Sequence, residues 1–406
     1  MELNERHNRE ALEQLHLIAS ENFFSPSVGR ILGSDLGNRV AEGWAEQRYY
    51  PGIEQYEAIE RMGLEAVKDV LGAEFVDPRP ISGTLANLIV YRALTKPGDH
   101  ILSLKISDGG HVSMAGSTPR IAGLKVDYLP FSSETFEISA SAAVDQILRS
   151  RPALVVLGGS VILFPQPVRE IVAATHRVGG IVLYDASHVI GLTIGGVFQN
   201  PLVEGADVLT FSTCKTLPGP QHAFICAKNE YAESIKKATF PGLVSGHHLH
   251  ETVAAFVAFL ELAEYGADYA RQTVANARAL GAALSNQGVD VLAATQGYTD
   301  THMILVRPSA MTAAEAERVL ESVNIICNRN LLPGDKSPAH ASGLRLGAQE
   351  VTHLGMREDD MFVIAELIAD TLSGRRDPKA VCDMVVNFRK DFQRVHYCFD
   401  EEAVQA

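Results

Sequence analysis

The chain has 406 residues, 46% of them hydrophobic and 21% charged, an ordinary composition for a globular protein with a large core. Its formal net charge is −14, so a surface that binds nucleic acid or anionic membranes is not expected. Every apolar run is well short of the ~20 residues that a membrane-spanning helix needs, and we expect no membrane contact.

The first 30 residues are predicted to form an arm that packs against the rest of the chain. Their start, MELNERHNREALEQL, is polar and acidic, and it resembles neither a signal peptide nor a transit peptide. The 5 cysteines are scattered without metal-binding spacing, so we expect reduced thiols and no metal site. These features together predict a cytoplasmic protein.

Beyond the arm, helical and strand patterns alternate. Residues 57–72 and 82–95 have the apolar period of helices. Short apolar runs, typical of strands, lie at 100–104, 125–130, 153–159, 180–185 and 207–212. Strands that alternate with helices favour an α/β domain with a mostly parallel sheet. The runs are apolar throughout, as expected where both faces of a sheet are covered.

The pattern changes near residue 250. A long helical stretch covers residues 251–284, and a strand is predicted at 301–308. Thr312 and Glu315 then form a capping-box signature, and residues 359–372 form a further amphipathic helix. We therefore predict a large domain at residues 31–249 and a smaller α+β domain at residues 250–406.

Two ionisable residues stand where predicted strands end. Asp185 closes the run at 180–185, and Lys215 comes just after the run at 207–212. Ligands of open α/β sheets bind beyond the carboxyl ends of the strands, so both side chains are expected to face one cleft. Taken singly, Asp185 is also typical of a helix N-cap, and Lys215 of a solvated surface cation.

A neighbouring acid and lysine together suit pyridoxal 5′-phosphate (PLP). The lysine amine forms a Schiff base with the aldehyde, and the acid keeps the pyridine nitrogen protonated. PLP also needs an anion site. Ser82, Gly83 and Thr84 begin a predicted helix, whose free N–H groups favour a phosphate. The sequence therefore favours a PLP site at these strand ends.

Longer motifs carry a resemblance to a known family, and they occur in order along most of the chain. They are LIASENF, NRVAEGWAEQRYYPG, SGTLAN, DGGHVSMAG, DASHVIGL, STCKTLPGP, FPGLVSGHHLH, NRNLLPGDKSP and SGLRLG. With them the sequence resembles the serine hydroxymethyltransferases, which are PLP enzymes of fold type I. The resemblance implies a PLP-dependent transferase fold, PLP as cofactor and an amino acid as substrate.

The resemblance also implies which residues contact the cofactor. Lys215 would hold PLP as a Schiff base, Asp185 would pair with the pyridine nitrogen, and His111 would stack on the ring. The other implied cofactor contacts are Ser82, Gly83 and Thr84 at the phosphate, Ser160 and His188 near the ring hydroxyl, and the loop around Gly246 from an adjacent subunit.

Further roles concern the substrate. The resemblance implies that Arg345 holds the α-carboxylate as a bidentate fork with Ser20 beside it, and that Glu42 transfers a proton. Tyr50 would reach the active site of an adjacent subunit. Glu42 and Tyr50 thus join Lys215 and His111 as the implied catalytic residues. Shared sites imply a homodimer, and pairing of two dimers into a tetramer is left open.

Several positions depart from the family motifs near the substrate. Cys214 stands where the family has His, Val40 and Trp44 where it has Tyr, and Gln221 where it has a cation. The subunit-contact loop reads VSGHH instead of QGGP, and its histidines are interpreted as polar lining or subunit contacts. Because the cofactor contacts survive, we expect a reshaped, more apolar substrate mouth, with Trp44 in it, for a bulkier side chain.

Three hypotheses about function follow. The first is an enzyme of specialised metabolism, such as antibiotic biosynthesis, acting at Cα or Cβ of a β-substituted amino acid. An S-conjugated cysteine undergoing β-elimination or decarboxylative conversion is one example, as in lincosamide-pathway enzymes related to this family. The second is serine hydroxymethyltransferase itself, with serine and tetrahydrofolate, or a threonine aldolase or transaldolase. The third is a non-catalytic scaffold, against which the retained Lys215, Asp185 and Arg345 speak.

Overall fold

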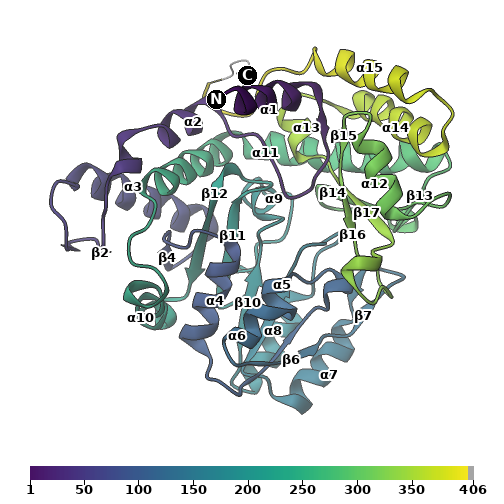
Figure 1. Ribbon diagram of the computed structural model, residues 1–406. Coiled ribbons are helices and arrows are strands. Elements are labelled where there is room, and N and C mark those ends of the chain that lie inside the picture. The colour runs from purple at the N-terminus through teal and green to yellow at the C-terminus, as the bar shows by residue number, and fades with distance from the viewer. Residues whose placement is uncertain (401–406) are drawn as a thin grey trace.

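The computed structural model describes residues 1–400, and a seven-stranded sheet forms its centre (Figure 1). Its strands, in spatial order, are β4 (Phe75–Asp77), β12 (Pro218–Ala227), β11 (Val208–Cys214), β10 (Ile181–Asp185), β9 (Leu154–Gly158), β5 (His100–Ser103) and β6 (Lys125–Tyr128). The pairs from β11 to β6 are parallel, and β12 and β4 are antiparallel additions at one edge. The predicted α/β class with a mostly parallel sheet is confirmed.

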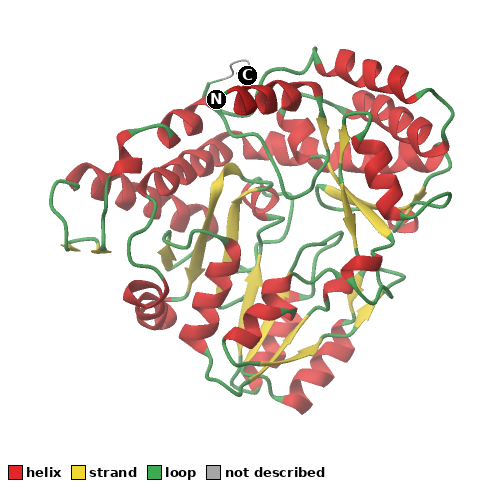
Figure 2. Cartoon of the chain, in the orientation of Figure 1, coloured by secondary structure: helices red, strands yellow, loops and turns green. Residues whose placement is uncertain are grey.

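Helices cover both faces of this sheet (Figure 2). They are α3 (Glu54–Leu71), α4 (Gly83–Leu94), α5 (Val112–Ala115), α6 (Ser117–Ile121), α7 (Ala140–Ser150), α8 (Val168–Arg177), α9 (Ile190–Ile194) and α10 (Asn229–Lys237). Successive strand residues point to opposite faces, so Val155 and Leu157 join one core while Leu154 and Val156 join another. The two edge strands differ, because β6 is mostly exposed whereas β4 is buried.

A second core lies beside the first. Its four-stranded antiparallel sheet contains β13 (Asp290–Val291), β14 (Met303–Arg307), β17 (Gly343–Gly347) and β16 (Asn328–Asn330). Its helices are α12 (Ala313–Glu321), α13 (Gln349–His353), α14 (Glu358–Ser373) and α15 (Pro378–Arg389). The capping box predicted at Thr312 and Glu315 is confirmed at the start of α12.

One long helix joins the two cores. α11 (Leu249–Asn286) places Ala254 and Phe259 in the core of the large sheet, and Leu280 and Leu284 in the core of the small one. A continuous helix across both cores limits how freely they can move apart. The domain boundaries at residues 30 and 249 stay predictions.

The N-terminal arm crosses between the cores. After α1 (Glu2–Glu13), strand β1 (Leu15–His16) pairs with β15 (Ile325–Ile326), and α2 (Pro26–Leu32) follows. Between them, Gly347 donates its N–H to the carbonyl of Leu17 (2.7 Å), and the Gln349 amide donates to the carbonyl of Ile18 (2.8 Å). These contacts fix a segment whose next residues reach the candidate site.

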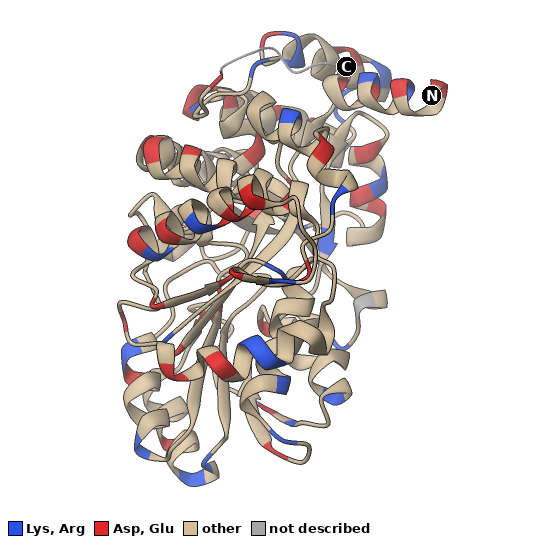
Figure 3. Ribbon diagram, turned by 90° about the vertical axis from the view of Figure 1, so that its left-hand side faces the viewer, with Lys and Arg blue, Asp and Glu red and all other residues tan. Residues whose placement is uncertain are grey.

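Charged residues lie mostly on the outer helices and loops (Figure 3). This distribution is expected for a chain whose strands are covered on both faces. Within residues 1–400, none of the helices combines the length and the apolar character needed to cross a bilayer.

Packing of α3 on α11 depends on Gly63. A Cβ at this position would lie 2.4 Å from Cγ of Phe256, inside its ring contact distance. We expect Gly63→Ala to destabilise the protein by about 1–3 kcal/mol, because the ring would have to shift in a filled core. A lowered thermal midpoint would show this. Glu65→Ala, at an exposed position of the same helix, is the control and should change stability by less than ~0.5 kcal/mol. Equal midpoints for the two variants would contradict the packing argument.

Candidate active site

An open cavity of about 380 Å³ lies at the carboxyl ends of β10 and β11. Cavities of this size are typical of small-molecule sites. Its walls bring together the following residues singled out from the sequence: Ser20, Ser82, Gly83, Thr84, His111, Ser160, Asp185, His188, Lys215 and Arg345. Residues from the arm, from both cores and from connecting loops therefore line one cavity.

Lys215 follows β11 directly. Its Nζ donates a hydrogen bond to Oγ of Ser212 (2.7 Å), and its backbone carbonyl accepts one from the Asn22 amide (2.6 Å). Burial lowers the pKa of the Lys215 amine, although the Cys214 thiol and Asp185 act in the opposite direction. Because no carboxylate forms an ion pair with this amine in the described chain, it can become the neutral nucleophile that a Schiff base requires.

Asp185 is the last residue of β10, and its side chain is buried. The Asn87 amide donates to its Oδ2 (2.7 Å), and the backbone N–H of Ser187 donates to its Oδ1 (3.1 Å). Both oxygens of the side chain therefore accept a hydrogen bond from the protein. A cationic N–H in the cavity would be its natural partner.

Two histidines face the same cavity in neutral form. Burial lowers the pKa of His111, and Lys215 and Arg345 lower it further, against the attraction of Asp185. Burial lowers the pKa of His188 well below its usual value, and the same two cations add to this. The ring of His188 also stacks on that of His302, with centroids 5.6 Å apart. Neutral rings suit contacts with a flat heterocycle.

The start of α4 forms an anion site. Ser82 is the N-cap, and its side chain accepts a hydrogen bond from the N–H of Leu85 (3.2 Å). The preceding N–H groups of this first turn are free for a ligand, and the helix dipole favours a negative one. A Cβ on Gly83 would lie 3.2 Å from Oγ of Ser187, so glycine leaves this end of the cavity open.

Arg345 is a buried cation without an acidic partner among residues 1–400. One Nη atom donates to the carbonyl of Ser160 (2.8 Å), the other lies 3.5 Å from Oγ of Ser20 and 3.3 Å from Oδ1 of Asn328, and Nε is unpaired. Burial lowers its pKa to about 10, which still leaves it charged at neutral pH. An unpaired guanidinium in a cavity is expected to bind a carboxylate.

These features fit PLP, residue by residue. The amine of Lys215 suits the aldehyde, the carboxylate of Asp185 suits the ring nitrogen, and the α4 start suits the phosphate. Arg345, which lines the same cavity and has no acidic partner among residues 1–400, suits the carboxylate of an amino acid beside them. The donors and acceptors that the cofactor needs are therefore present in one cavity.

Four residues singled out from the sequence lie outside this cavity. Glu42 is close to Gly246, since a Cβ on that glycine would lie 3.8 Å from its Oε1. Trp44, in the hairpin of β2 (Gly43–Trp44) and β3 (Gln47–Arg48), is covered by the Arg79 guanidinium at 3.7 Å. Tyr50 is 47% exposed. These residues could therefore contact a substrate only in the cavity of another subunit.

Positions that depart from the family motifs form one wall near Lys215. Cys214 and Gln221 both line the cavity, and the thiol lies 3.4 Å from Oε1 of Gln221. Burial raises the pKa of Cys214, so the thiol stays neutral. His247 is buried, and its Nε2 is hydrogen-bonded to the Tyr56 hydroxyl (2.6 Å). It therefore anchors its loop and does not line the cavity.

The sequence interpretation missed several residues of the site. Ser212, Ser187 and His222 line the cavity, while Asn22 and Asn87 hold Lys215 and Asp185 from behind. No local signal distinguished Ser212, because Thr210 and Thr213 of the same strand also carry hydroxyl groups. His222 stands next to Gln221, and its Nε2 donates to the carbonyl of Pro78 (2.6 Å).

A second cavity of about 320 Å³ adjoins the first and shares His111, Ser160 and Arg345 with it. Apolar residues line it, including Val112 and Leu331, and an ion pair between Arg329 and Glu317 (2.6 Å) lies at its wall. The two cavities together give room for more than an amino-acid backbone.

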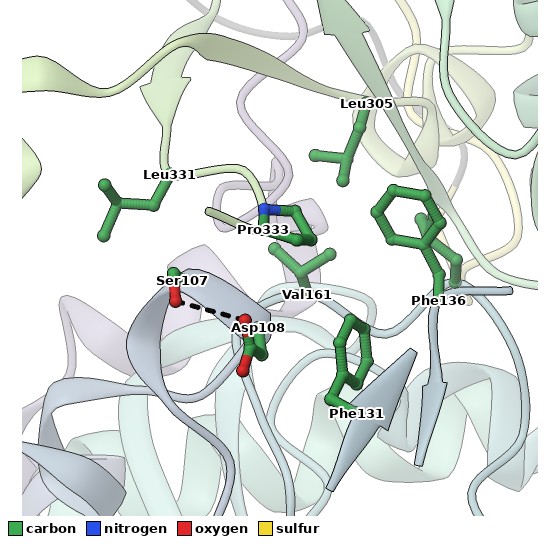
Figure 4. Close-up of a pocket in the computed structure, with 10 residues that line it drawn as sticks. Ser107, Asp108, Phe131, Phe136, Val161, Leu305, Leu331 and Pro333 are labelled. Carbon is green, nitrogen blue, oxygen red and sulfur yellow. Dashed lines mark hydrogen bonds between the residues drawn. The ribbon is translucent and has the colours of Figure 1, made fainter. Parts of the chain in front are cut away.

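A third hollow is too small for a substrate. Figure 4 shows it between Phe131, Phe136 and Leu305, with Ser107 donating to Asp108 (3.1 Å) nearby. Its volume of about 10 Å³ leaves room for a single water molecule at most. Of these three hollows, only the two larger ones therefore have room for a small-molecule ligand.

Comparisons with known proteins agree with this site. A family model described as serine hydroxymethyltransferase matches residues 1–368. Serine hydroxymethyltransferase of Methanopyrus kandleri is 48% identical over 400 residues, covering 97% of this chain and 93% of that protein. The Korarchaeum cryptofilum enzyme of the same name is 44% identical, covering 95% and 93%.

A solved structure is also similar. It is the L-threonine transaldolase from Pseudomonas fluorescens in its internal aldimine state, with a TM-score of 0.91 and 29% sequence identity. The match covers 98% of this chain and 92% of that one. Together with the family match, it confirms the PLP-dependent transferase fold and PLP as the cofactor.

Lys215 should be the residue that binds PLP covalently. We expect Lys215→Ala, dialysed and then mixed with PLP, to lack the visible absorbance band of lysine-bound PLP, because the variant has no amine to bond the aldehyde. Lys237→Ala, at an exposed position, should keep the band. A retained band in Lys215→Ala would overturn this assignment.

Arg345 should bind the substrate carboxylate. We expect Arg345→Lys to raise the KM for the amino-acid substrate by at least about tenfold, because an ammonium group cannot form the two-point contact of a guanidinium. The visible band of bound PLP should persist, since the cofactor contacts are untouched. An unchanged KM in steady-state kinetics would place the carboxylate elsewhere.

Proposed function

This chain belongs to the serine hydroxymethyltransferase family, and we propose that it acts at Cα or Cβ of a β-substituted amino acid or amino-acid conjugate in specialised metabolism. One observation carries the proposal. The cofactor and carboxylate residues are retained, whereas the wall beside Lys215 consists of a neutral thiol and an amide, Cys214 and Gln221. An S-conjugated cysteine, cleaved by β-elimination or converted by decarboxylation, has the expected chemistry.

The residues of this chain orient any such substrate in the same way. Arg345 binds the α-carboxylate, and the buried Lys215 amine accepts or returns a proton beside Ser212. Asp185 holds a positive charge at the ring nitrogen of the cofactor. When bound, PLP supplies an electron sink for the carbanion that bond breaking leaves. The choice of bond then depends on how the walls hold the side chain.

The walls support a substrate larger than serine. Positioned donors often contribute about 10²-fold or more each to a reaction, so loss of an imidazole at Cys214 and of a cation at Gln221 weakens the case for the serine reaction. The second cavity adjoins the carboxylate site at Arg345. Its lining is mixed, with Val112 and Leu331 beside Arg329 and Glu317, and it has room for a β-substituent that extends beyond the first cavity.

A homodimer with shared sites is part of the proposal. Glu42, Tyr50 and Gly246 lie away from the cavity of their own chain, and Tyr49 and Tyr50 are 72% and 47% exposed. Exposed aromatic residues of this kind are typical of interfaces. The scattered cysteines support a reducing, cytoplasmic setting.

The reaction of serine with tetrahydrofolate is the second candidate. It is favoured by the names of the relatives that are 48% and 44% identical to this chain. In that case the second cavity would hold the cosubstrate in place of a β-substituent. A threonine transaldolase activity is favoured by the similar solved structure. The scaffold alternative has no support in these comparisons.

Substrate assays of the purified holoenzyme separate these candidates. We expect turnover of S-substituted cysteines, measured as released thiol, pyruvate or carbon dioxide, to exceed turnover of serine with tetrahydrofolate by at least about 10²-fold. Serine turnover near a typical enzymatic rate of ~10 s⁻¹ would overturn the proposal. Aldehyde transfer from threonine as the dominant reaction would overturn it in favour of the transaldolase.

The wall itself can be tested with a double variant. Cys214→His combined with Gln221→Arg is expected to raise activity with serine and tetrahydrofolate at least about tenfold, because it restores an imidazole and a cation next to Lys215. The matched control is Cys382→His, at a half-buried site on α15. Equal serine activity in both variants would show that the wall does not select the substrate.

A further inference from the structure

Asn87 joins two cofactor residues from behind. It lies on α4, its side chain is fully buried, and it does not line the cavity. Its Nδ2 donates to Oδ2 of Asp185 (2.7 Å) and to Oγ of Ser113 (2.8 Å). Its Oδ1 accepts a hydrogen bond from the Thr210 hydroxyl (2.7 Å). Both amide hydrogens and the amide oxygen are thus in use.

The direction of these bonds follows from Asp185. A carboxylate only accepts, so the nitrogen of the Asn87 amide must face it, and the oxygen must face Thr210. Ser113 then accepts from the same nitrogen, which leaves the hydroxyl hydrogen of Ser113 for its remaining neighbour. The orientation of the whole chain of bonds is therefore determined.

That remaining neighbour is His111. Oγ of Ser113 lies 2.7 Å from Nδ1 of His111, and the backbone N–H of Ser113 donates to the same nitrogen (3.2 Å). Because Nδ1 accepts from both groups, the hydrogen of the neutral imidazole is on Nε2. The Tyr91 hydroxyl donates to the carbonyl of Ser113 (2.8 Å) and supports the turn that places it.

We propose that Asn87 is a positioning residue for the cofactor, because one amide fixes the rotamer of Asp185 and, through Ser113, the hydrogen-bonding state of His111. The inference rests on the cofactor assignment, and it holds whichever bond the enzyme breaks. With the Asn87 amide at Oδ2 and the N–H of Ser187 at Oδ1, the carboxylate is held in one orientation, and its remaining lone pairs can face the ring nitrogen. Without the donors, the buried carboxylate would rotate or lose its charge.

The variant Asn87→Asp tests this role through its pH dependence. It keeps the shape of the side chain but sets a second carboxyl group within hydrogen-bond distance of Asp185. At low pH the two groups share a proton, so one can still donate to the other. As the pH rises both ionise, and the donor is lost. The titratable groups that act on Asp185 are His111, Lys215, Tyr91 and Tyr184, and all of them are unchanged by the substitution.

The measurement is the dissociation constant of PLP for protein stripped of cofactor, from about pH 6 to about pH 8.5. At each pH, the dissociation constant of the variant is divided by that of the unmodified protein. Effects of the titration of Lys215 and of PLP itself are common to both proteins and cancel in this ratio. We expect this ratio to rise by about tenfold per pH unit once the carboxyl pair ionises. In Asn87→Leu, which cannot donate at any pH, the ratio should be high and constant.

Tyr91→Phe is the matched control. It removes a hydrogen bond from the same buried cluster and leaves both donors of Asn87 in place, so its ratio should stay within about threefold of unity at every pH. Ser113→Ala keeps the bond to Asp185 and should weaken PLP binding less than Asn87→Leu. Thermal melting verifies that each variant folds. A pH-independent ratio for folded Asn87→Asp, or a ratio near unity for Asn87→Leu, would overturn the proposal.

Discussion

The parallel pairing of β10 with β11 is the constraint on which the site depends. It sets Asp185 opposite Thr210, so the carboxylate lies beside the strand that ends just before Lys215. The register of β11 against β12 shifts between Ser212 and Cys214, and such irregularities change the direction of the following side chains. The acid and the amine face one cavity because of how two strands pair, although they are distant in sequence.

The rest of the site is added to this edge by other parts of the chain. Arg345 comes from β17 of the smaller sheet, and Ser20 from the arm that Gln349 holds in place. Asn22 of the same arm contacts the backbone of Lys215. The carboxylate site and the amine therefore depend on the same arm, and a displacement of the arm would affect both. The continuous helix α11 opposes relative motion of the cores that carry them.

The ends of the strands could be predicted from the sequence, because buried parallel strands are apolar runs and the residues that follow them are polar. That pattern predicts the positions of Asp185 and Lys215, whereas their roles were inferred from the pair and from the family resemblance. Asn87 and Ser212 could not be assigned in this way, because their roles depend on contacts between segments far apart in sequence. The position of Trp44 under Arg79 could not be predicted either, because no local sequence pattern indicates this contact.

The arrangement separates the chemistry of the cofactor from the choice of substrate. In the proposed function, Arg345 holds the carboxylate that every α-amino acid has, so it distinguishes poorly between substrates. Only the side chain differs among amino acids, and we propose that it meets the wall of Cys214 and Gln221 and the second cavity. Changes in that wall can alter specificity without disturbing Asp185 or the α4 anion site, since these lie on other elements. Family membership thus fixes the cofactor, and in the proposed function the wall determines which amino acid the enzyme accepts.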